Sequence, residues 1–416
     1  MRFSFIHAAD LHIDSPFASL GVRDPAVAAR FALAGRRSVD ALVEATIDSG
    51  AAFLIIAGDV FDGDWKDVTT GLFFARALGR VHRAGVPTIL VKGNHDAESL
   101  MSRALAYPES VRILPSNRAD TLCFDALHVA VHGRSFGSRK VPDDFVASYP
   151  ARREGWFNIG ILHTGLDGAR GHESYAPCTV EDLRRFGYDY WALGHVHAAE
   201  IVCRDPWIVY PGNTQGRSIR ETGPKGAMRV TVEDGRVVDA TPLFLDQARW
   251  ANEIIDASGC EGFADALALV GESLARLHGA ADGRPLAVRL TLSGTTSAHL
   301  ELVARQEAIE DEARALGFGI AEDCWVEQVK LRTSAPPRPV AVPAEPDALD
   351  LDALLAASAD DPDYAQAVSE LIAGIAEKLP RELRQEITGD GKESLARRIA
   401  LARDYLAGGL GGELSA

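Results

Sequence analysis

The sequence contains few cysteines, no long apolar run and no recognisable secretion leader. Its five cysteines are scattered and odd in number, so no disulfide framework is expected and reduced thiols are favoured. No apolar stretch approaches the about 20 residues that a membrane-spanning helix needs, so no membrane partner is expected. An apolar β-type stretch at residues 3–8 leads directly to Asp10. Cleavage of a leader here would remove the expected site residue Asp10. These absences predict a cytoplasmic protein.

Basic side chains are also under-represented, with 43 Lys and Arg against 59 Asp and Glu and a formal net charge of −16. Because DNA-binding proteins are usually basic, this charge favours weak or partner-assisted DNA binding over tight binding by this chain alone. Bound cations would offset part of the negative charge. The acids are also uneven, since residues 345–363 contain no Lys or Arg. A small phosphodiester substrate therefore stays open beside DNA.

Five short polar blocks stand out because each follows a short β-type apolar stretch. In chain order they are Asp10-Leu11-His12, Gly58-Asp59-Val60-Phe61-Asp62, Gly93-Asn94-His95-Asp96, His163-Thr164-Gly165 and Gly194-His195-Val196-His197. The carboxyl ends of neighbouring strands meet at one edge of a sheet, where α/β folds place their sites. One such block alone could be an ordinary turn or cap, but five in this order indicate a single site.

The residue types in these blocks are those that hold two divalent cations in proteins. We expect Asp59 to bridge the two cations, because a carboxylate has two oxygens. The other expected ligands divide between the cations, with Asp10, His12 and His197 at the first and Asn94, His163 and His195 at the second. Two cations that share a hydroxide make a strong nucleophile and clamp phosphoryl oxygens.

His95 is expected to act in the chemistry, because the other residues already fill both metal shells. It could protonate a leaving oxygen or stabilise negative charge, and Asp96 would fix its tautomer. In the Gly- and Pro-rich loop after the last block, Arg217 and Arg220 are expected to bind substrate phosphates. For a second basic cluster after residues 127–132, phosphate contact and solvated surface charge are equally open; it comprises Arg134, Arg139 and Lys140.

Together the blocks resemble the signature of the calcineurin-like metallophosphoesterases over roughly residues 1–245. Three longer stretches resemble the YhaO branch of the DNA repair nucleases, which are relatives of SbcD; they are residues 5–17, 210–217 and 219–226. The resemblance implies a manganese-dependent DNA exonuclease, with or without endonuclease activity, and Mg²⁺, Fe²⁺ or Zn²⁺ as other metals. It also implies an SMC-type ATPase partner similar to YhaN or SbcC. Asp62 stands where some nuclease relatives carry a histidine, and we expect it to support the site without binding metal.

The apolar periodicity predicts an α/β fold with two packed sheets flanked by helices, as in the resembling family. Residues 1–246 would form this metallophosphoesterase sandwich, beginning β-α-β-α-β, with a hairpin turn at residues 233–236. Residues 247–332 would form a small α+β capping domain. Residues 333–348 are rich in Pro and Ala and read as a linker. Residues 349–416 would form a helical C-terminal tail.

Two of these regions have alternative roles. The capping domain either helps position DNA, as the resemblance implies, or merely covers a sheet edge. The tail helices either dock back on the body or pack on an ATPase partner, and the linker before them favours the partner. Homodimer formation is a further expectation. Helical spacing places His82, His278 and His299 on helices, where surface positions are expected.

Three functions compete on this basis. The first is a two-metal DNA nuclease that works with an ATPase. The second is a metallophosphodiesterase of the same superfamily that acts on small phosphoesters or nucleotides, which the acidic charge favours. The third is a non-catalytic metal-binding scaffold for the ATPase, against which the complete ligand set and His95 argue.

Overall fold

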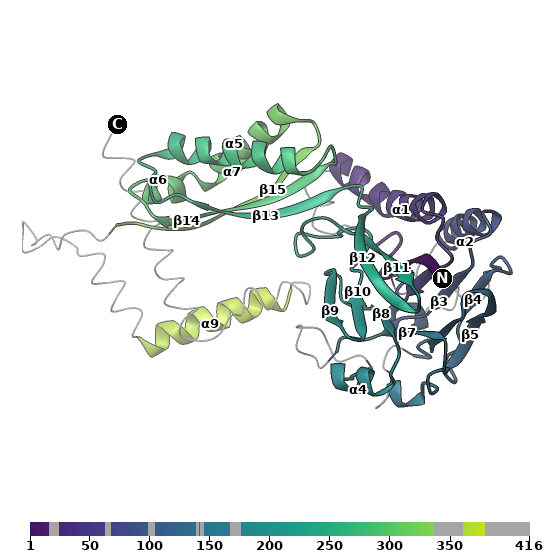
Figure 1. Ribbon diagram of the computed structural model, residues 1–416. Coiled ribbons are helices and arrows are strands. Elements are labelled where there is room, and N and C mark those ends of the chain that lie inside the picture. Colours follow the sequence, from purple (N-terminus) through teal and green to yellow (C-terminus); the bar gives the residue numbers. More distant parts are fainter. Residues whose placement is uncertain are drawn as a thin grey trace, which may run out of the picture. The chain divides into compact units, whose positions relative to one another are not determined.

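The computed structural model describes residues 1–15, 25–62, 68–98, 105–138, 141, 145–166, 176–336 and 361–378. These residues form two compact units. The first comprises Met1–Asn252, Leu277–Val288 and Glu322–Glu327, and it carries all five polar blocks. The second comprises Glu253–Arg276, Arg289–Ala321 and the described residues from Gln328 onward. Figure 1 shows the helices and strands of both units.

Six strands of the first unit form a mixed sheet in the order β12-β11-β1-β2-β3-β4. Their bounds are β1 (Arg2–Ala8), β2 (Leu54–Ala57), β3 (Thr88–Val91), β4 (Val111–Ile113), β11 (Gly226–Glu233) and β12 (Arg236–Phe244). Strands β1 to β4 run parallel, whereas β11 is antiparallel to both β1 and β12. The expected hairpin turn is confirmed, because Glu233 pairs with Arg236 around Asp234 and Gly235, which both have positive φ.

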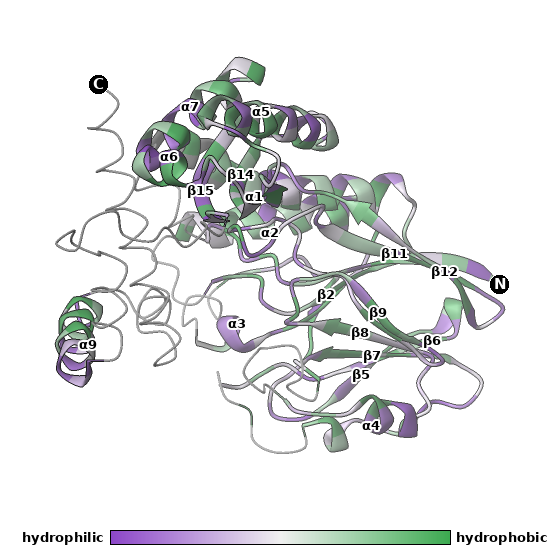
Figure 2. Cartoon of the chain, turned by 90° about the vertical axis from the view of Figure 1, so that its left-hand side faces the viewer, coloured by the Kyte–Doolittle hydropathy of each residue, from purple (hydrophilic) through white to green (hydrophobic). Residues whose placement is uncertain are grey.

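A second six-stranded sheet has the order β5-β6-β7-β8-β10-β9. Its strands are β5 (Asp120–Phe124), β6 (Val129–Gly133), β7 (Phe157–His163), β8 (Tyr190–Gly194), β9 (Glu200–Arg204) and β10 (Trp207–Tyr210). Strands β6, β7, β8 and β10 are parallel, and antiparallel β5 and β9 form the edges. All residues of β6, β7 and β8 are buried, and Figure 2 draws much of β7 in green, the colour of hydrophobic residues.

The main core lies between the two sheets. Alternate residues of a strand point to opposite faces. Phe5 and Ile55 of the first sheet therefore meet Val131 and Ile159 of the second in one buried cluster. Ile6, one residue after Phe5, belongs to a different cluster on the other face of the first sheet. The two sheets thus form a sandwich, as predicted.

Helices cover both outer faces of this sandwich. They are α1 (Pro25–Asp48), α2 (Val68–Arg83), α3 (Asn94–Glu98) and α4 (Val180–Arg185), with short 3-10 turns η2 (Asp125–Leu127) and η3 (Val146–Ser148). Leu42 of α1 and Phe74 of α2 pack with Ile6 against the first sheet. Leu183 of α4 packs with Trp191 against the second sheet. The predicted α/β sandwich flanked by helices is therefore confirmed.

The residues that follow form a three-stranded sheet in the order β13-β14-β15. The elements are β13 (Arg249–Asp256), α5 (Phe263–Ala280), β14 (Leu286–Thr295), α6 (His299–Ala304), α7 (Gln306–Ile320) and β15 (Cys324–Ser334). Their order agrees with the expected small α+β domain, whose bounds of 247–332 stay a prediction. The surface position expected for His299 is wrong. The residue is buried, and its Nδ1 lies 2.8 Å from the Thr333 hydroxyl.

Of the predicted tail, the structure describes one helix, α9 (Pro362–Ala376). It begins with an Asp361 cap, whose carboxylate accepts a hydrogen bond from the Asp363 N–H at 2.9 Å, and with Pro362 in its first turn. The predicted linker and most of the tail lie outside the described residues. In the described part of the chain, no helix is long and apolar enough to cross a membrane.

Candidate metal centre

The five polar blocks lie at the carboxyl ends of strands β1, β2, β3, β7 and β8, as their sequence positions predicted. Several residues there adopt a left-handed backbone that non-glycine residues rarely take, with φ of 52° at Asp10, 39° at His12, 51° at Asp59 and 95° at His195. The loops are also fastened together, because the Asp10 N–H donates to the Gly58 carbonyl at 3.0 Å and the His12 N–H to the Asp59 carbonyl at 3.1 Å. Strained conformations of this kind cluster at functional sites.

Two glycines allow these loops to approach one another closely. A Cβ on Gly93 would lie 2.2 Å from Asp59 Oδ1, and a Cβ on Gly194 would lie 2.0 Å from the Ala57 carbonyl oxygen. Real side chains do not fit at such distances. The glycines therefore permit the convergence of β2, β3 and β8 on which the site depends.

The first cluster consists of Asp10, His12 and His197, whose ligand-type atoms lie within 4.8 Å of one another. The Nε2 atoms of the two histidines are 3.2 Å apart, and His197 Nε2 is 3.9 Å from Asp10 Oδ1. Asp10 is held from behind by the His195 N–H, which donates to its two carboxylate oxygens at 2.9 and 3.1 Å. Burial raises the pKa of Asp10 to about 6. These three residues are the set predicted for the first cation.

The second cluster consists of Asp59, His163 and His195, and Asn94 lies beside it. His163 Nε2 is 2.9 Å from Asn94 Oδ1 and 3.3 Å from Asp59 Oδ2. The opposite nitrogen, His163 Nδ1, donates to the Ala57 carbonyl at 2.9 Å. All four residues are buried, and they are the set predicted for the second cation.

Asp59 belongs to the second cluster and also faces the first. Its Oδ2 is 3.3 Å from His163 Nε2 and 3.9 Å from His12 Nε2, so one carboxylate faces ligands of both groups. Its Oδ1 accepts the backbone N–H of His95 at 3.0 Å. This is the position that a bridging ligand requires.

The donor set fits two divalent cations. Because His163 Nδ1 donates to a carbonyl, its Nε2 presents a lone pair toward the oxygens of Asn94 and Asp59. The His163 nitrogen and the Asn94 and Asp59 oxygens then face one another as three Lewis bases. Only a proton or a metal ion between them can offset the repulsion of their lone pairs. Burial lowers the pKa of His163, but the Asp59 charge outweighs it and raises that pKa to about 9. Nitrogen and oxygen donors in this mixture suit Mn²⁺, Fe²⁺ or Zn²⁺.

His95 stands beside the clusters and its side chain is one-third exposed. Its ring centroid lies 5.1 Å from that of His12, and its Nδ1 is 3.2 Å from Asp62 Oδ1. The hydrogen bond with Asp62 is the main reason that the pKa of His95 is raised. A raised pKa favours the protonated imidazole, which suits a group that donates a proton.

The pairing expected between His95 and Asp96 requires a correction. The Asp96 carboxylate is buried and accepts backbone N–H groups, from Phe61 at 2.9 Å, Gly93 at 3.1 Å and Val60 at 3.2 Å. Its side chain therefore ties the β2 loop to the β3 loop. Asp62, not Asp96, is the carboxylate that orients His95. The expectation that Asp96 fixes the tautomer of His95 is wrong, because the Asp96 carboxylate is occupied by backbone N–H groups.

Glu221 is a second residue whose role the sequence did not reveal. Its Oε1 accepts His197 Nδ1–H at 2.7 Å and Arg217 Nη2–H at 3.1 Å. Burial alone would raise the pKa of Glu221, but His197 and Arg217 hold it well below its usual range. The only available signal was an acid four residues after Arg217 in a polar loop, and such a spacing is common on surfaces.

A groove of about 630 Å³ opens beside His197. The predicted substrate residues Arg217 and Arg220 both line it, together with Lys225. Arg220 is exposed, whereas the Arg217 guanidinium is half-buried against Glu221. The Lys225 ammonium donates to the His197 carbonyl at 2.9 Å. Of the second basic cluster, Arg139 and Lys140 lie outside the described residues.

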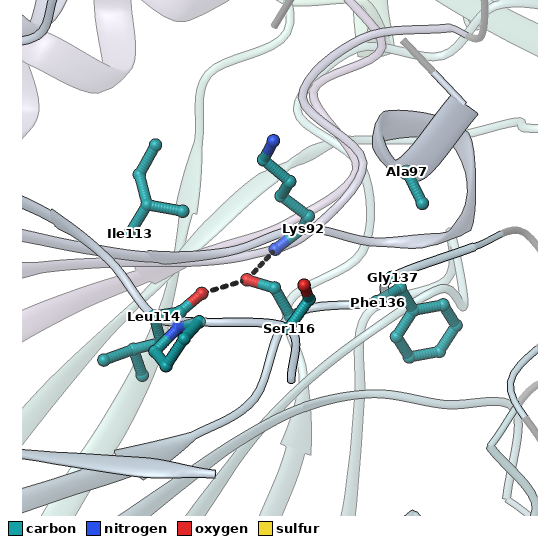
Figure 3. A pocket seen from close by; sticks show the side chains of 9 residues that line it. Lys92, Ala97, Ile113, Leu114, Ser116, Phe136 and Gly137 are labelled. Carbon is teal, nitrogen blue, oxygen red and sulfur yellow. Dashed lines mark hydrogen bonds between the residues drawn. The ribbon is translucent and has the colours of Figure 1, made fainter. Parts of the chain in front are cut away.

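Figure 3 shows a smaller pocket, of about 240 Å³. Lys92, Ala97, Ser116 and Phe136 are among its walls. The Ser135 hydroxyl donates to the Leu114 carbonyl and accepts the Lys92 N–H at 3.0 Å. The Phe136 ring meets the His163 ring edge-on at 5.7 Å, so this pocket adjoins the second cluster.

Comparison with known proteins identifies the family. The calcineurin-like phosphoesterase family model matches residues 3–199, and the model for the middle domain of metallophosphoesterase YhaO matches residues 250–334. A relative described as an uncharacterized metallophosphoesterase YhaO, from Bacillus subtilis (strain 168), is 32% identical over 324 residues, which span 77% of this chain and 78% of the relative. The chain belongs to the YhaO family of calcineurin-like metallophosphoesterases.

Two more distant similarities accompany this YhaO-family match. The DNA double-strand break repair protein Mre11 of Methanopyrus kandleri is 26% identical over 289 residues, which cover 61% of this chain and 59% of that protein. The crystal structure of TT1561 from Thermus thermophilus is 12% identical, with a TM-score of 0.34, and the match covers 58% of this chain and 99% of that one. As a calcineurin-like phosphoesterase, the YhaO-family chain is a metal-dependent hydrolase of phosphoester bonds that uses two divalent cations.

Proposed function

We propose that this YhaO-family protein is a Mn²⁺-dependent DNA exonuclease. The observation that carries the proposal is the Asp59 carboxylate, which belongs to the buried second cluster and faces His12 of the first, with His95 beside them outside both. The similarity to a protein named for DNA double-strand break repair supports DNA as the substrate. The groove that Arg220 lines offers room for a phosphate backbone next to the first cluster.

The chain's own residues divide the work of phosphodiester hydrolysis. Asp10, His12 and His197, with Asp59, would hold one cation, and Asn94, His163 and His195, with Asp59, the other. The bound cations supply a nucleophilic hydroxide and neutralise phosphoryl charge. His95, which Asp62 orients, gives a proton to the leaving oxygen. Arg220 holds a neighbouring phosphate and positions the strand without reading its bases.

Cleavage assays with the purified chain would test this proposal. The substrates are linear duplex DNA, single-stranded DNA, circular DNA and bis-para-nitrophenyl phosphate, each with Mn²⁺ or Mg²⁺. Shortening of linear DNA from an end is the expected result, and nicking of the circle would add endonuclease activity. Hydrolysis of the small diester without any action on DNA would favour the small-phosphoester enzyme instead. A chain that binds metal but cleaves nothing would favour the scaffold.

We further propose that the tail docks on an SMC-type ATPase in the cytoplasm. Helix α9 supports this, because its Leu371 and Ile375 side chains are 67% and 48% exposed. An apolar helix face of this kind suits burial in a partner's groove, and the acidic residues 345–363 would steer toward a basic surface. In the full chain, Leu371→Asp with Ile375→Asp should abolish capture of the purified ATPase. If this variant still captured the ATPase and hydrolysed the small diester normally, the docking proposal would be wrong. The proposed nuclease activity would not be affected by that result.

A further inference from the structure

A continuous row of side chains runs behind the two metal clusters, and its first half is built on Glu221. The Glu221 carboxylate is mostly buried and supports the metal-ligand candidate His197 at 2.7 Å. The same carboxylate also accepts the Arg217 backbone N–H at 2.8 Å, the Arg217 Nη2–H at 3.1 Å and the Asn213 amide at 2.9 Å. Glu221 thus fixes both His197 and the guanidinium of Arg217.

Asp62 forms the second half of the row. Its Oδ2 lies 3.8 Å from Arg217 Nη1 and accepts the Ser15 hydroxyl at 2.7 Å. Its Oδ1 lies 3.2 Å from His95 Nδ1 and 3.5 Å from His12 Nδ1. Asp62 therefore faces a metal-ligand candidate and the proton donor with the same oxygen. The Arg217 guanidinium lies between this carboxylate and that of Glu221.

The shape of arginine suits this position. Its planar guanidinium presents several N–H groups in a fixed fork, whereas a lysine ammonium is a compact point charge on a flexible stem. Carboxylates behind a metal-binding imidazole set its ring orientation and strengthen its binding, typically by 10- to 100-fold in metal affinity. A guanidinium that faces two such carboxylates is in a position to transmit a shift of one to the other.

We propose that Arg217 is a positioning residue that couples Glu221 to Asp62, so that His197, His12 and His95 are set as one unit. The Arg217 guanidinium supports the first metal cluster and orients the proton donor through Asp62. Arg217 is then not a direct contact of the substrate phosphate, unlike Arg220. The inference rests on the proposed function only for the roles of the cations and of His95 in hydrolysis.

A set of single and double variants would test this coupling. Mn²⁺ affinity would be measured by calorimetric titration, and kcat and KM with bis-para-nitrophenyl phosphate at saturating Mn²⁺. Because the substrate is a small diester, a failure of DNA cleavage would not affect the result. The variants are Arg217→Gln, Arg217→Lys, Glu221→Gln and the Arg217→Gln/Glu221→Gln double, with Arg236→Ala, an exposed arginine on the β11–β12 turn, as the matched control.

Arg217→Gln should weaken Mn²⁺ binding about 10-fold or more and lower kcat, with little change in KM. Arg217→Lys should restore the charge without restoring kcat. The double variant should be no worse than the more severe single variant, because residues that act as a unit are not additive. The control should match the parent chain in both measurements.

Three results would overturn the coupling. One is an Arg217→Gln protein with normal Mn²⁺ affinity and normal kcat. Another is a rise in KM alone, which would make Arg217 a substrate contact. The third is a double variant whose defects are the product of the two single defects. Circular dichroism melting would exclude misfolded variants, and Arg217→Lys keeps the test valid if Arg217→Gln does not fold.

Discussion

At the carboxyl ends of β1, β2, β7 and β8, charged groups are buried, whereas the arginines at the amino ends of β8 and β10 face solvent. Asp10 and Asp59 at the first end are each only 1% exposed. At the second end, four arginines line a groove of about 640 Å³: Arg152, Arg184, Arg204 and Arg236. There Arg152 lies 3.7 Å from Glu154, and the two side chains are 38% and 86% exposed.

The difference lies in what compensates the charge. Water and mobile counterions screen an exposed ion pair, which contributes about 0–1 kcal/mol to stability. A buried carboxylate has no water, so it requires a partner of fixed position. The buried carboxylates at the carboxyl end therefore need bound cations to compensate their charge. The exposed arginines at the amino end need no fixed partner, because water and mobile ions screen them.

Asp59→Ala is the sharpest way to break the carboxyl end. Removal of the shared carboxylate should abolish binding of both cations and all hydrolysis, because each cation loses a ligand at once. Metal content of the purified variant and its activity on the small diester would be measured together. A variant that retained both cations and activity would show that Asp59 is not the bridge.

Substitution of His95 should have the next largest effect. His95→Gln should keep both cations but lose roughly 10²-fold or more in kcat, as loss of a positioned acid does. Metal analysis and kinetics on the same preparation would separate the two effects. Near-normal turnover with full metal loading would remove His95 from the chemistry.

The same buried charges predict how metal binding depends on pH. The pKa of Asp10 is raised to about 6 by burial, and the Asp59 charge outweighs burial to raise that of His163 to about 9. Protons compete with the cations for these ligands. Mn²⁺ affinity should therefore fall about 10-fold per unit as pH drops from 8 toward 6, and more steeply below 6. A flat affinity over this range in calorimetric titrations would contradict the assignment.

Arg220 should matter for DNA and much less for small substrates. Arg220→Ala should weaken DNA binding several-fold, equally across sequences, and reduce the slope of log K against log salt by about 1. Hydrolysis of bis-para-nitrophenyl phosphate should change less than twofold, by our estimate from its position on the groove. Equal losses on both substrates would point to support of the metal centre instead.

The smallest effect is expected at the amino end. Arg152→Ala removes an exposed side chain whose Nη1 donates to the Gly187 carbonyl at 2.8 Å. The free energy of unfolding should change by about 0.5 kcal/mol or less, and activity should stay unchanged. A large loss in chemical denaturation would mean that the two ends are less different than their exposure indicates.

The fold and the convergence of the ligands were predictable because they follow from local rules. Parallel strands of buried residues bring their carboxyl ends together, so a polar block after each strand is enough to locate the site. The expected β-α-β-α-β beginning is confirmed, and its first helix, α1 (Pro25–Asp48), follows from the same apolar periodicity.

Asp62 was expected to support the site, but the partners of the supporting carboxylates were not predictable in this way. Asp62 reaches His95 across 33 positions of the chain, and Asp96 reaches the Phe61 N–H across 35. No local pattern distinguishes which of two acids near a histidine will bond to it. Loop geometry decides, and it depends on glycine contacts such as that of Gly93 with Asp59.

The long span of the metal centre has a consequence for synthesis in the cell. The His195 N–H bonds to Asp10 from 185 positions away, and Glu221 lies 24 positions beyond His197. A chain emerging from the ribosome in amino-to-carboxyl order therefore cannot assemble the centre until β8 and the loop that carries His197 have been made. Chains that end before His197 lack one residue of the first cluster. A metal-dependent phosphoesterase is thereby inactive until its last candidate ligand has been translated.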